Sequence, residues 1–135
     1  SGALIKMCYE SGLTEAEMRK KIVGNGGFNA YLGTNDARDV EKRVNEGDKE
    51  ATLIRDAFVY QMSKNIGAMA AVLSGKVDAI IMTGGIAYDK AVTQMISDRV
   101  SFIAPVKLYP GEDELLALAQ GALRVMNGEE EAKAY

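Results

Sequence analysis

The sequence predicts an α/β fold in which parallel strands pack against helices. Between residues 49 and 126, helical patterns and short apolar runs alternate in the order helix, strand, helix, strand, helix. The apolar run at 77–82 is almost uninterrupted, as is typical of a strand buried on both faces of a parallel sheet. Two such strands joined through a helix imply a right-handed parallel crossover. The length of 135 residues suits one domain with its own core.

Composition and charge exclude several classes of protein. The chain is 47% hydrophobic and 26% charged, with a net charge of −3, so neither disorder nor nucleic-acid binding is expected. We expect no membrane span and no signal peptide. The chain has no histidine, which excludes Ser-His-Asp and Cys-His nucleophiles and leaves no nitrogen ligand for zinc. Its single cysteine, Cys8, favours a cytoplasmic location and is expected to be a buried structural thiol.

The amino-terminal part is predicted to contain short helices separated by glycine-rich breaks. The first helix begins without a cap, so we expect the polypeptide to extend further in that direction. Thr14 and Glu17 form a capping box that opens the second helix. In order, we expect a helix over 1–12, a charged helix ending near residue 23, a break at 24–27, a segment at 28–33 that is either extended or a closely packed loop, and a capped helix over 37–45.

The longest predicted helix covers residues 49–73. Its apolar face recurs at helical spacing, and we assign its methionines to core packing rather than to a ligand. Gly67 and the neighbouring alanines keep its second half thin enough for close packing. The expected buried face consists of Leu53, Ile54, Ala57, Phe58, Met62, Ile66, Met69, Ala70 and Leu73.

The carboxyl-terminal part is predicted to hold two strands and two helices. Pro105 lies inside the second predicted strand and cannot donate to a ladder, so this strand should be at an edge or bent. We expect strands at 77–82 and 101–108, a helix at 88–99 with Tyr88, Ala91, Val92, Met95 and Ile96 on one face, a turn at 109–111, a last helix from about 115 to 126 and a solvated acidic tail at 129–135.

Gly84 and Gly85 follow the first strand directly. Paired glycines at this point let the backbone approach a ligand, and the following helix would aim its N–H groups at the same place, which together would make a nucleotide pocket. The alternative is a tight connection between a strand and a helix with no ligand. The spacing fits neither Gly-x-Gly-x-x-Gly nor Gly-x-x-x-x-Gly-Lys-Ser/Thr, so a pocket here belongs to another nucleotide-binding class.

Two further turns carry candidate site residues. Because parallel strands end at the same edge of a sheet, the turns at 83–88 and 110–114 should be neighbours. The acids Glu112, Asp113 and Glu114 either cap a helix or hold a magnesium ion beside phosphates. Asp36 and Arg38 begin a third helix, where they form either a surface cap or a contact to the base or ribose of a nucleotide.

Five stretches of the chain resemble the carboxyl-terminal part of butyrate kinases. Butyrate kinases belong to the superfamily that includes acetate kinases, sugar kinases and actin. The glycine turn is closer to theirs than to that of acetate kinases, which is typically Gly-Ile-Gly-Glu-Asn. The stretches are Val-Gly-Asn-Gly-Gly (23–27), Tyr-Leu-Gly-Thr-Asn-Asp-Ala-Arg-Asp-Val-Glu (31–41), Ile-Gly-Ala-Met-Ala-Ala-Val-Leu (66–73), Asp-Ala-Ile-Ile-Met-Thr-Gly-Gly-Ile-Ala-Tyr (78–88) and Phe-Ile-Ala-Pro-Val-Lys-Leu-Tyr-Pro-Gly-Glu-Asp-Glu (102–114).

This resemblance implies the helix-rich half of an actin-like ATPase domain of the ribonuclease H-like type. It also implies ATP-dependent transfer of a phosphoryl group to a short-chain carboxylate, with ATP/ADP and Mg2+ as cofactors. By motif, Gly84, Gly85, Ile86 and Tyr88 would line or adjoin the adenosine pocket, Asp36, Ala37 and Arg38 would face them, and Asp113 with Glu112 would associate with the magnesium ion.

The family also implies what this chain does not hold. Its members are two-domain proteins of more than twice this length, so residues 1–135 would be one domain, the carboxyl-terminal lobe. The phosphate-binding loop of the other lobe, the acid pocket and the arginines around the transferred phosphoryl group would lie outside, and no catalytic residue is assigned here. We expect inactivity in isolation and a homodimer or larger homo-oligomer. The alternative is a non-catalytic nucleotide-binding or dimerisation module.

Overall fold

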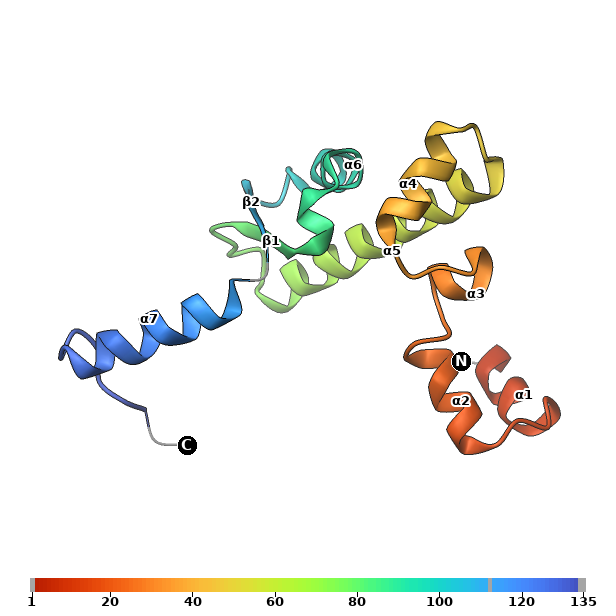
Figure 1. The fold of residues 1–135 in the computed structure, drawn as a ribbon, viewed down its shortest axis with the longest axis horizontal. Coiled ribbons are helices and arrows are strands. Elements are labelled where there is room, and N and C mark those ends of the chain that lie inside the picture. Colours follow the sequence, from red (N-terminus) through yellow and green to blue (C-terminus); the bar gives the residue numbers. More distant parts are fainter. Residues whose placement is uncertain (1, 112, 134–135) are drawn as a thin grey trace.

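The computed structural model describes residues 2–111 and 113–133 (Figure 1). Its central element is a long helix, with a small sheet and another helix on one side and shorter helices extending from both ends (Figure 1). The elements are α1 (Gly2–Glu10), α2 (Glu15–Ile22), α3 (Phe28–Leu32), α4 (Ala37–Asn45), α5 (Lys49–Val72), β1 (Ile80–Gly84), the 3-10 helix η1 (Gly85–Tyr88), α6 (Lys90–Val100), β2 (Val106–Pro110) and α7 (Glu114–Met126).

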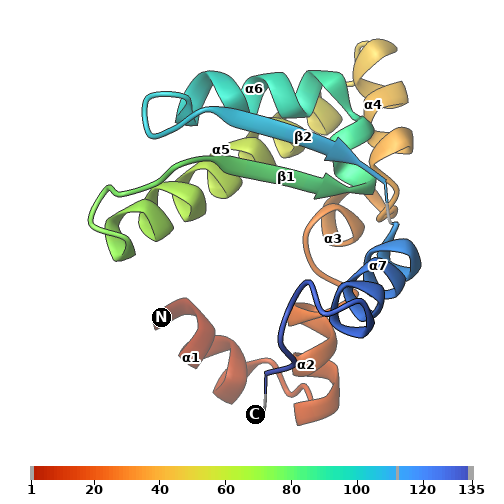
Figure 2. The ribbon, with the colours of Figure 1, turned by 90° about the vertical axis from the view of Figure 1, so that its left-hand side faces the viewer.

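The sheet consists of β1 and β2, which pair in parallel with Ile80 opposite Val106 and Gly84 opposite Pro110. The chain crosses from one strand to the other through α6, and Figure 2 shows both strands running in the same direction beside α5 and α6. The α/β class with parallel strands and packed helices is therefore confirmed. In the described part of the chain only one face of β1 is covered: Ile80 and Met82 are buried, and Ile81 is exposed. Burial on both faces, as predicted, is wrong for these residues.

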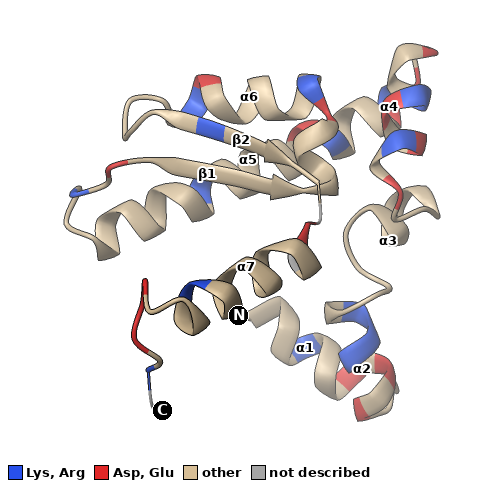
Figure 3. Ribbon diagram, turned by 60° about the vertical axis from the view of Figure 1, so that its left-hand side comes forward, with Lys and Arg blue, Asp and Glu red and all other residues tan. Residues whose placement is uncertain are grey.

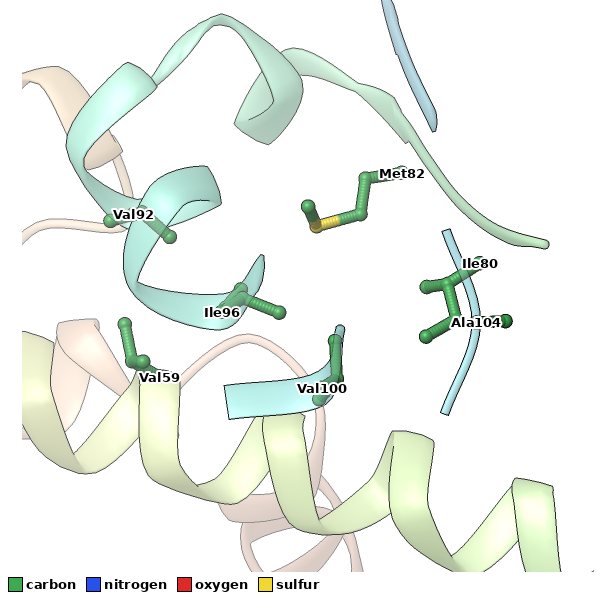
Figure 4. Close-up of a cluster of buried hydrophobic side chains, with 7 residues drawn as sticks. All are labelled: Val59, Ile80, Met82, Val92, Ile96, Val100 and Ala104. Carbon is green, nitrogen blue, oxygen red and sulfur yellow. The ribbon is translucent and has the colours of Figure 1, made fainter. Parts of the chain in front are cut away.

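The core lies between α5, α6 and the covered face of β1. Because valine and isoleucine side chains are wide at Cβ, they pack well between a helix and a pleated strand. Figure 4 shows the buried side chains converging from these elements: Val59 of α5, Val92, Ile96 and Val100 of α6, Ile80 and Met82 of β1, and Ala104 before β2.

Helix α5 starts where the sequence predicts, but only part of its predicted apolar face, including Phe58 and Ile66, packs against the core. Asp48 caps the helix by accepting hydrogen bonds from the N–H groups of Glu50 (2.9 Å) and Ala51 (3.0 Å). The buried residues are Ala51 and Val59, whereas Leu53 is 67% exposed. The helix is apolar on more than one side, so periodicity alone could not tell which side faces the core.

Both strands begin later than predicted, and Pro105 lies directly before the second one. β1 covers Ile80–Gly84 rather than 77–82, and β2 covers Val106–Pro110 rather than 101–108. The ladder opens where the Ile80 N–H donates to the Pro105 carbonyl (2.9 Å), and residues 101–104 form a turn before it. Pro105 therefore precedes the strand, and residues 109–110 belong to the strand instead of a turn.

The terminal helices make few contacts with this core. The capping box of α2 is present, since the Glu17 carboxylate accepts from the Thr14 N–H (2.8 Å) and the Thr14 hydroxyl accepts from the Glu17 N–H (3.3 Å). No residue of α1 is buried and Cys8 is exposed, so the prediction of a buried Cys8 is wrong.

The segment at 28–33, which the sequence left open, contains the short helix α3. α7 stops at Met126 as predicted, and residues 129–133 of the acidic tail are exposed. No described helix combines the length and apolarity that crossing a bilayer requires.

Candidate functional site

The glycine turn and the turn after β2 meet at the carboxyl edge of the sheet. Gly84 and Gly111 form a bridge in which the Gly84 N–H donates to the Gly111 carbonyl (3.2 Å) and the Gly111 N–H donates back (3.4 Å). A Cβ on Gly111 would lie 3.3 Å from the Tyr88 hydroxyl, so Tyr88 also reaches this point. The predicted proximity of the two turns is confirmed.

The two adjacent glycines meet different requirements. Gly84 has φ +74°, a left-handed conformation that favours glycine. Gly85 does not have a positive φ, and a Cβ there would meet no atom within 4 Å. The fold thus explains Gly84 but not Gly85, whose missing side chain leaves open space in front of the backbone.

The sequence predicts that an α-helix follows the glycine turn directly, but the structure differs. The chain first forms η1, and α6 begins only at Lys90. Asp89 caps α6 by accepting from the Val92 N–H (2.9 Å). This cap occupies one of the free N–H groups of α6, and η1 separates the start of α6 from the glycine turn.

One cavity joins the glycine turn to the start of α4. It has a volume of about 860 Å³ and brings together residues that are about fifty positions apart in sequence. Six of the seven predicted nucleotide-binding residues line it: Asp36, Ala37 and Arg38 from the start of α4, and Gly85, Ile86 and Tyr88 from η1. The seventh, Gly84, lines a neighbouring groove.

Asp36 and Arg38 form a forked pair at the entrance to α4. The Arg38 Nε lies 3.0 and 3.1 Å from the two Asp36 carboxylate oxygens, and the Arg38 N–H donates to the same carboxylate (2.9 Å). The pKa of Asp36 is lowered to about 2, mainly by hydrogen bonds from the Arg38 side chain and to a smaller extent by the hydrogen bond from the Arg38 backbone N–H. Arg38 keeps 89% of its side chain exposed while Asp36 orients it.

The neighbouring groove holds the predicted metal-associated acid. It measures about 590 Å³ and lies between the ends of both strands and the start of α7; its lining includes Gly84, Gly111 and Asp113. Asp113 sits at the N-cap position of α7 but makes no side-chain cap hydrogen bond, and its Oδ2 lies 3.9 Å from a Cβ placed on Gly111. Its carboxylate therefore faces the groove. Glu112, the other predicted ligand, is outside the described residues.

The described residues contain no cluster of three acids, cysteines or histidines that could enclose a metal ion. Magnesium usually binds through one or two carboxylates together with substrate phosphates and waters, so a single exposed carboxylate can be enough on the protein side. Asp113 fits such a role.

Sequence reasoning missed five residues that line the larger cavity. Phe28 lay in the segment left undecided, and Phe58 was assigned to the core face of the long helix. Their contribution depends on α3 folding against α5, which no local pattern reveals. The additional lining residues are Phe28, Asn35, Glu41, Phe58 and Asp89.

Comparison with known proteins gives consistent matches. The model of the Acetokinase family matches residues 2–109. The chain is 57% identical over 135 residues to butyrate kinase 2 of Clostridium acetobutylicum, covering all of this chain and 38% of that protein. It is 56% identical over 132 residues to probable butyrate kinase 2 of Caldanaerobacter subterraneus subsp. tengcongensis, covering 98% and 37%. The chain thus spans under two fifths of the length of these relatives.

The fold has a counterpart among solved structures. The crystal structure of Porphyromonas gingivalis acetate kinase superposes with a TM-score of 0.76, at 21% sequence identity, over 90% of this chain and 37% of that one. This likeness confirms the predicted fold.

Proposed function

The chain belongs to the acetokinase family, and from this premise we propose that it is the carboxyl-terminal, nucleotide-binding lobe of a two-domain carboxylate kinase. The proposed reaction is that of a butyrate kinase: butyrate and ATP give butyryl phosphate and ADP. The similarity to butyrate kinases supports this acceptor. The observation that carries the proposal is the single cavity shared by Asp36–Arg38 and the glycine turn.

Within this cavity the adenosine of ATP or ADP is proposed to lie between η1 and the start of α4. Gly85 allows close approach because it places no side chain in front of the backbone. Ile86 supplies an apolar contact, Tyr88 adjoins it, and Ala37 with the forked pair of Asp36 and Arg38 closes the opposite side. The phosphates would then extend past Gly84 into the neighbouring groove.

Magnesium is the proposed metal at that groove, held by Asp113 directly or through water, with Glu112 as the second carboxylate. When bound, it would neutralise phosphate charge beside the attacking carboxylate. The side chains of this lobe would bind and orient the nucleotide rather than exchange a proton, since a carboxylate nucleophile carries no proton to remove.

We propose that the 135-residue chain alone does not catalyse the transfer. A carboxylate oxygen must attack the γ-phosphorus while the bond to ADP breaks, and both partners are anionic. Catalysis therefore needs cations around the γ-phosphate. Among the described residues that line the cavity and the groove, Arg38 is the only cation, and Asp36 already pairs with it. The other lobe would supply the missing charges and the acid pocket.

Titration of the chain with a fluorescent ADP analogue, with and without magnesium, tests the nucleotide-binding role. We expect saturable binding that tightens with magnesium and is competed by ATP. A coupled assay with ATP and butyrate tests the second part. Formation of an acyl phosphate by the 135-residue chain would contradict the proposed inactivity, and failure to bind any nucleotide would contradict the proposed lobe.

The second candidate is a non-catalytic dimerisation module in a cytoplasmic protein of the same family. It is favoured by apolar side chains exposed on α5 and α7, among them Leu53, Met69, Leu115 and Leu118. In Figure 3, α7 is almost free of charged residues. Sedimentation at increasing concentration tests this second role, because a strict monomer would contradict dimerisation through this lobe.

A further inference from the structure

Two phenylalanines form an aromatic wall in the larger cavity. Phe28 begins α3 and Phe58 lies in the middle of α5; their ring centroids are 5.0 Å apart and their planes are inclined by 44°. Both rings line the cavity that also contains Ile86 and Ala37. Both are half-buried, so each keeps part of its surface accessible. We call Phe28 and Phe58 the aromatic wall.

The aromatic wall is held in place by contacts on both sides. Phe58 packs against the hydrophobic core. α3 is tied from its other end, because the Arg43 Nη1 donates to the Leu32 carbonyl (3.0 Å) while the Arg43 Nε donates to Asp48 (2.8 Å) at the start of α5. A wall with this support is preorganised and would lose little freedom when a ligand binds.

The charges in the cavity indicate which part of a nucleotide belongs there. Three carboxylates line it, those of Asp36, Glu41 and Asp89, against the single cation Arg38 within the described residues. This excess of negative charge repels phosphates and suits neutral groups that donate hydrogen bonds, such as base amino groups and ribose hydroxyls. An aromatic base has, in addition, a flat face that stacks on a phenyl ring.

We propose that the base of the nucleotide stacks on the aromatic wall, and that Phe28 and Phe58 thereby contribute to the affinity for the nucleotide. This assignment rests on the proposed nucleotide-binding function and adds the orientation of the ligand: base against α3 and α5, phosphates toward Gly84 and Gly111. It also gives the half-buried ring of Phe28 a role other than packing.

ADP titration by calorimetry, in the presence of magnesium, tests this orientation in the unmodified chain and in variants. Phe28→Leu and Phe58→Leu should each weaken ADP binding by about tenfold, as expected for the loss of one base–aromatic stack. Phe28→Tyr keeps an aromatic ring at this position and should bind ADP with the affinity of the unmodified chain. Phe102→Leu is the matched control: Phe102 is 85% exposed in the turn before β2, so its loss should leave ADP affinity unchanged.

Proton NMR of bound ADP separates stacking from a merely structural role. Ring currents from the wall should shift the adenine H2 and H8 signals upfield in the unmodified chain and in Phe28→Tyr. Unshifted signals in the unmodified chain, or unchanged ADP affinity in both leucine variants, would overturn the stacking assignment while leaving nucleotide binding intact. If the unmodified chain bound no ADP, the proposed function itself would fail, and the stacking assignment with it.

Discussion

Gly84 and Gly85 are adjacent, yet the fold requires only the first. Gly84→Ala should cost roughly 1–3 kcal/mol of stability, because a Cβ disfavours the backbone conformation observed there, φ 74° with ψ −168°. Gly85→Val should fold nearly normally but weaken ADP binding by at least about tenfold, because its side chain would enter the space proposed for adenosine. Chemical denaturation and ADP titration of both variants measure the two effects. Unchanged ADP affinity in Gly85→Val would reject the site.

Asp36 provides a pH-dependent test of the forked pair. Its pKa falls from 3.8 to about 2 because Arg38 donates hydrogen bonds to it, from the side chain first and then from the backbone. A lowered pKa contributes stability that is complete above pH 3.8 and is lost as the pH falls through about 2. Carbon NMR titration of the Asp36 carboxyl should give this low midpoint. In Arg38→Ala the midpoint should rise but stay below 3.8, because the backbone donor at position 38 remains.

At the residue scale, the sequence predicted the polar and glycine positions of the site better than its apolar wall. Asp36 and Gly84 stand out because a cap and a positive φ each leave a local signature. Phe58 looks like any core residue of an amphipathic helix. Only the packing of α3 on α5 turns it toward the cavity, and that packing is a tertiary contact between segments thirty residues apart.

Helix α5 offers a test of which face packs. Val59→Ala should cost about 2 kcal/mol, because it removes buried methyl groups from the centre of the core. Leu53 lies on α5 before Val59 and its side chain is exposed. Leu53→Ala should therefore change stability by less than about 0.5 kcal/mol. Urea denaturation measures both. Equal losses would favour the face that periodicity predicted over the one observed.

The start of α7 distinguishes a cap from a metal ligand. Because the Asp113 side chain makes no cap hydrogen bond, Asp113→Asn should leave the melting temperature of the chain nearly unchanged. The same change should reduce the gain in ADP affinity that magnesium provides, since a neutral amide is a weaker magnesium ligand. Asp48→Ala is a useful control, as Asp48 caps α5 with two hydrogen bonds and its loss should affect stability instead. Equal destabilisation by both changes would show that Asp113 is structural.

At the element scale, helix ends were more predictable than strand ends. Capping residues such as Thr14 and Asp48 fix where helices begin through contacts within a few residues. A strand begins where a partner strand can pair with it. β1 begins at Ile80, whose N–H donates to the Pro105 carbonyl. Because the partner is distant in sequence, the onset of pairing could not be read from the run at 77–82.

In the whole molecule, stability is expected to be uneven. The sheet, α5 and α6 share the core, whereas α1 has no buried residue and α7 exposes most of its leucines. Amide hydrogen exchange should therefore be slowest in α6, β1 and the middle of α5 and fast in α1 and α7. Strong protection of α7 in the isolated chain would contradict this arrangement and would point to packing through a second copy.

The nucleotide is proposed to bind in one cavity, built by the start of α4 and the glycine turn after β1. Titration of the nitrogen-15-labelled chain with ADP and magnesium tests it most directly through backbone amide shifts. We expect saturable shifts at residues 36–38 and 84–88 with a common dissociation constant, and none at residues 101–104 at the opposite end of the sheet. Shifts confined to one of the two predicted segments, or centred on residues 101–104, would contradict it.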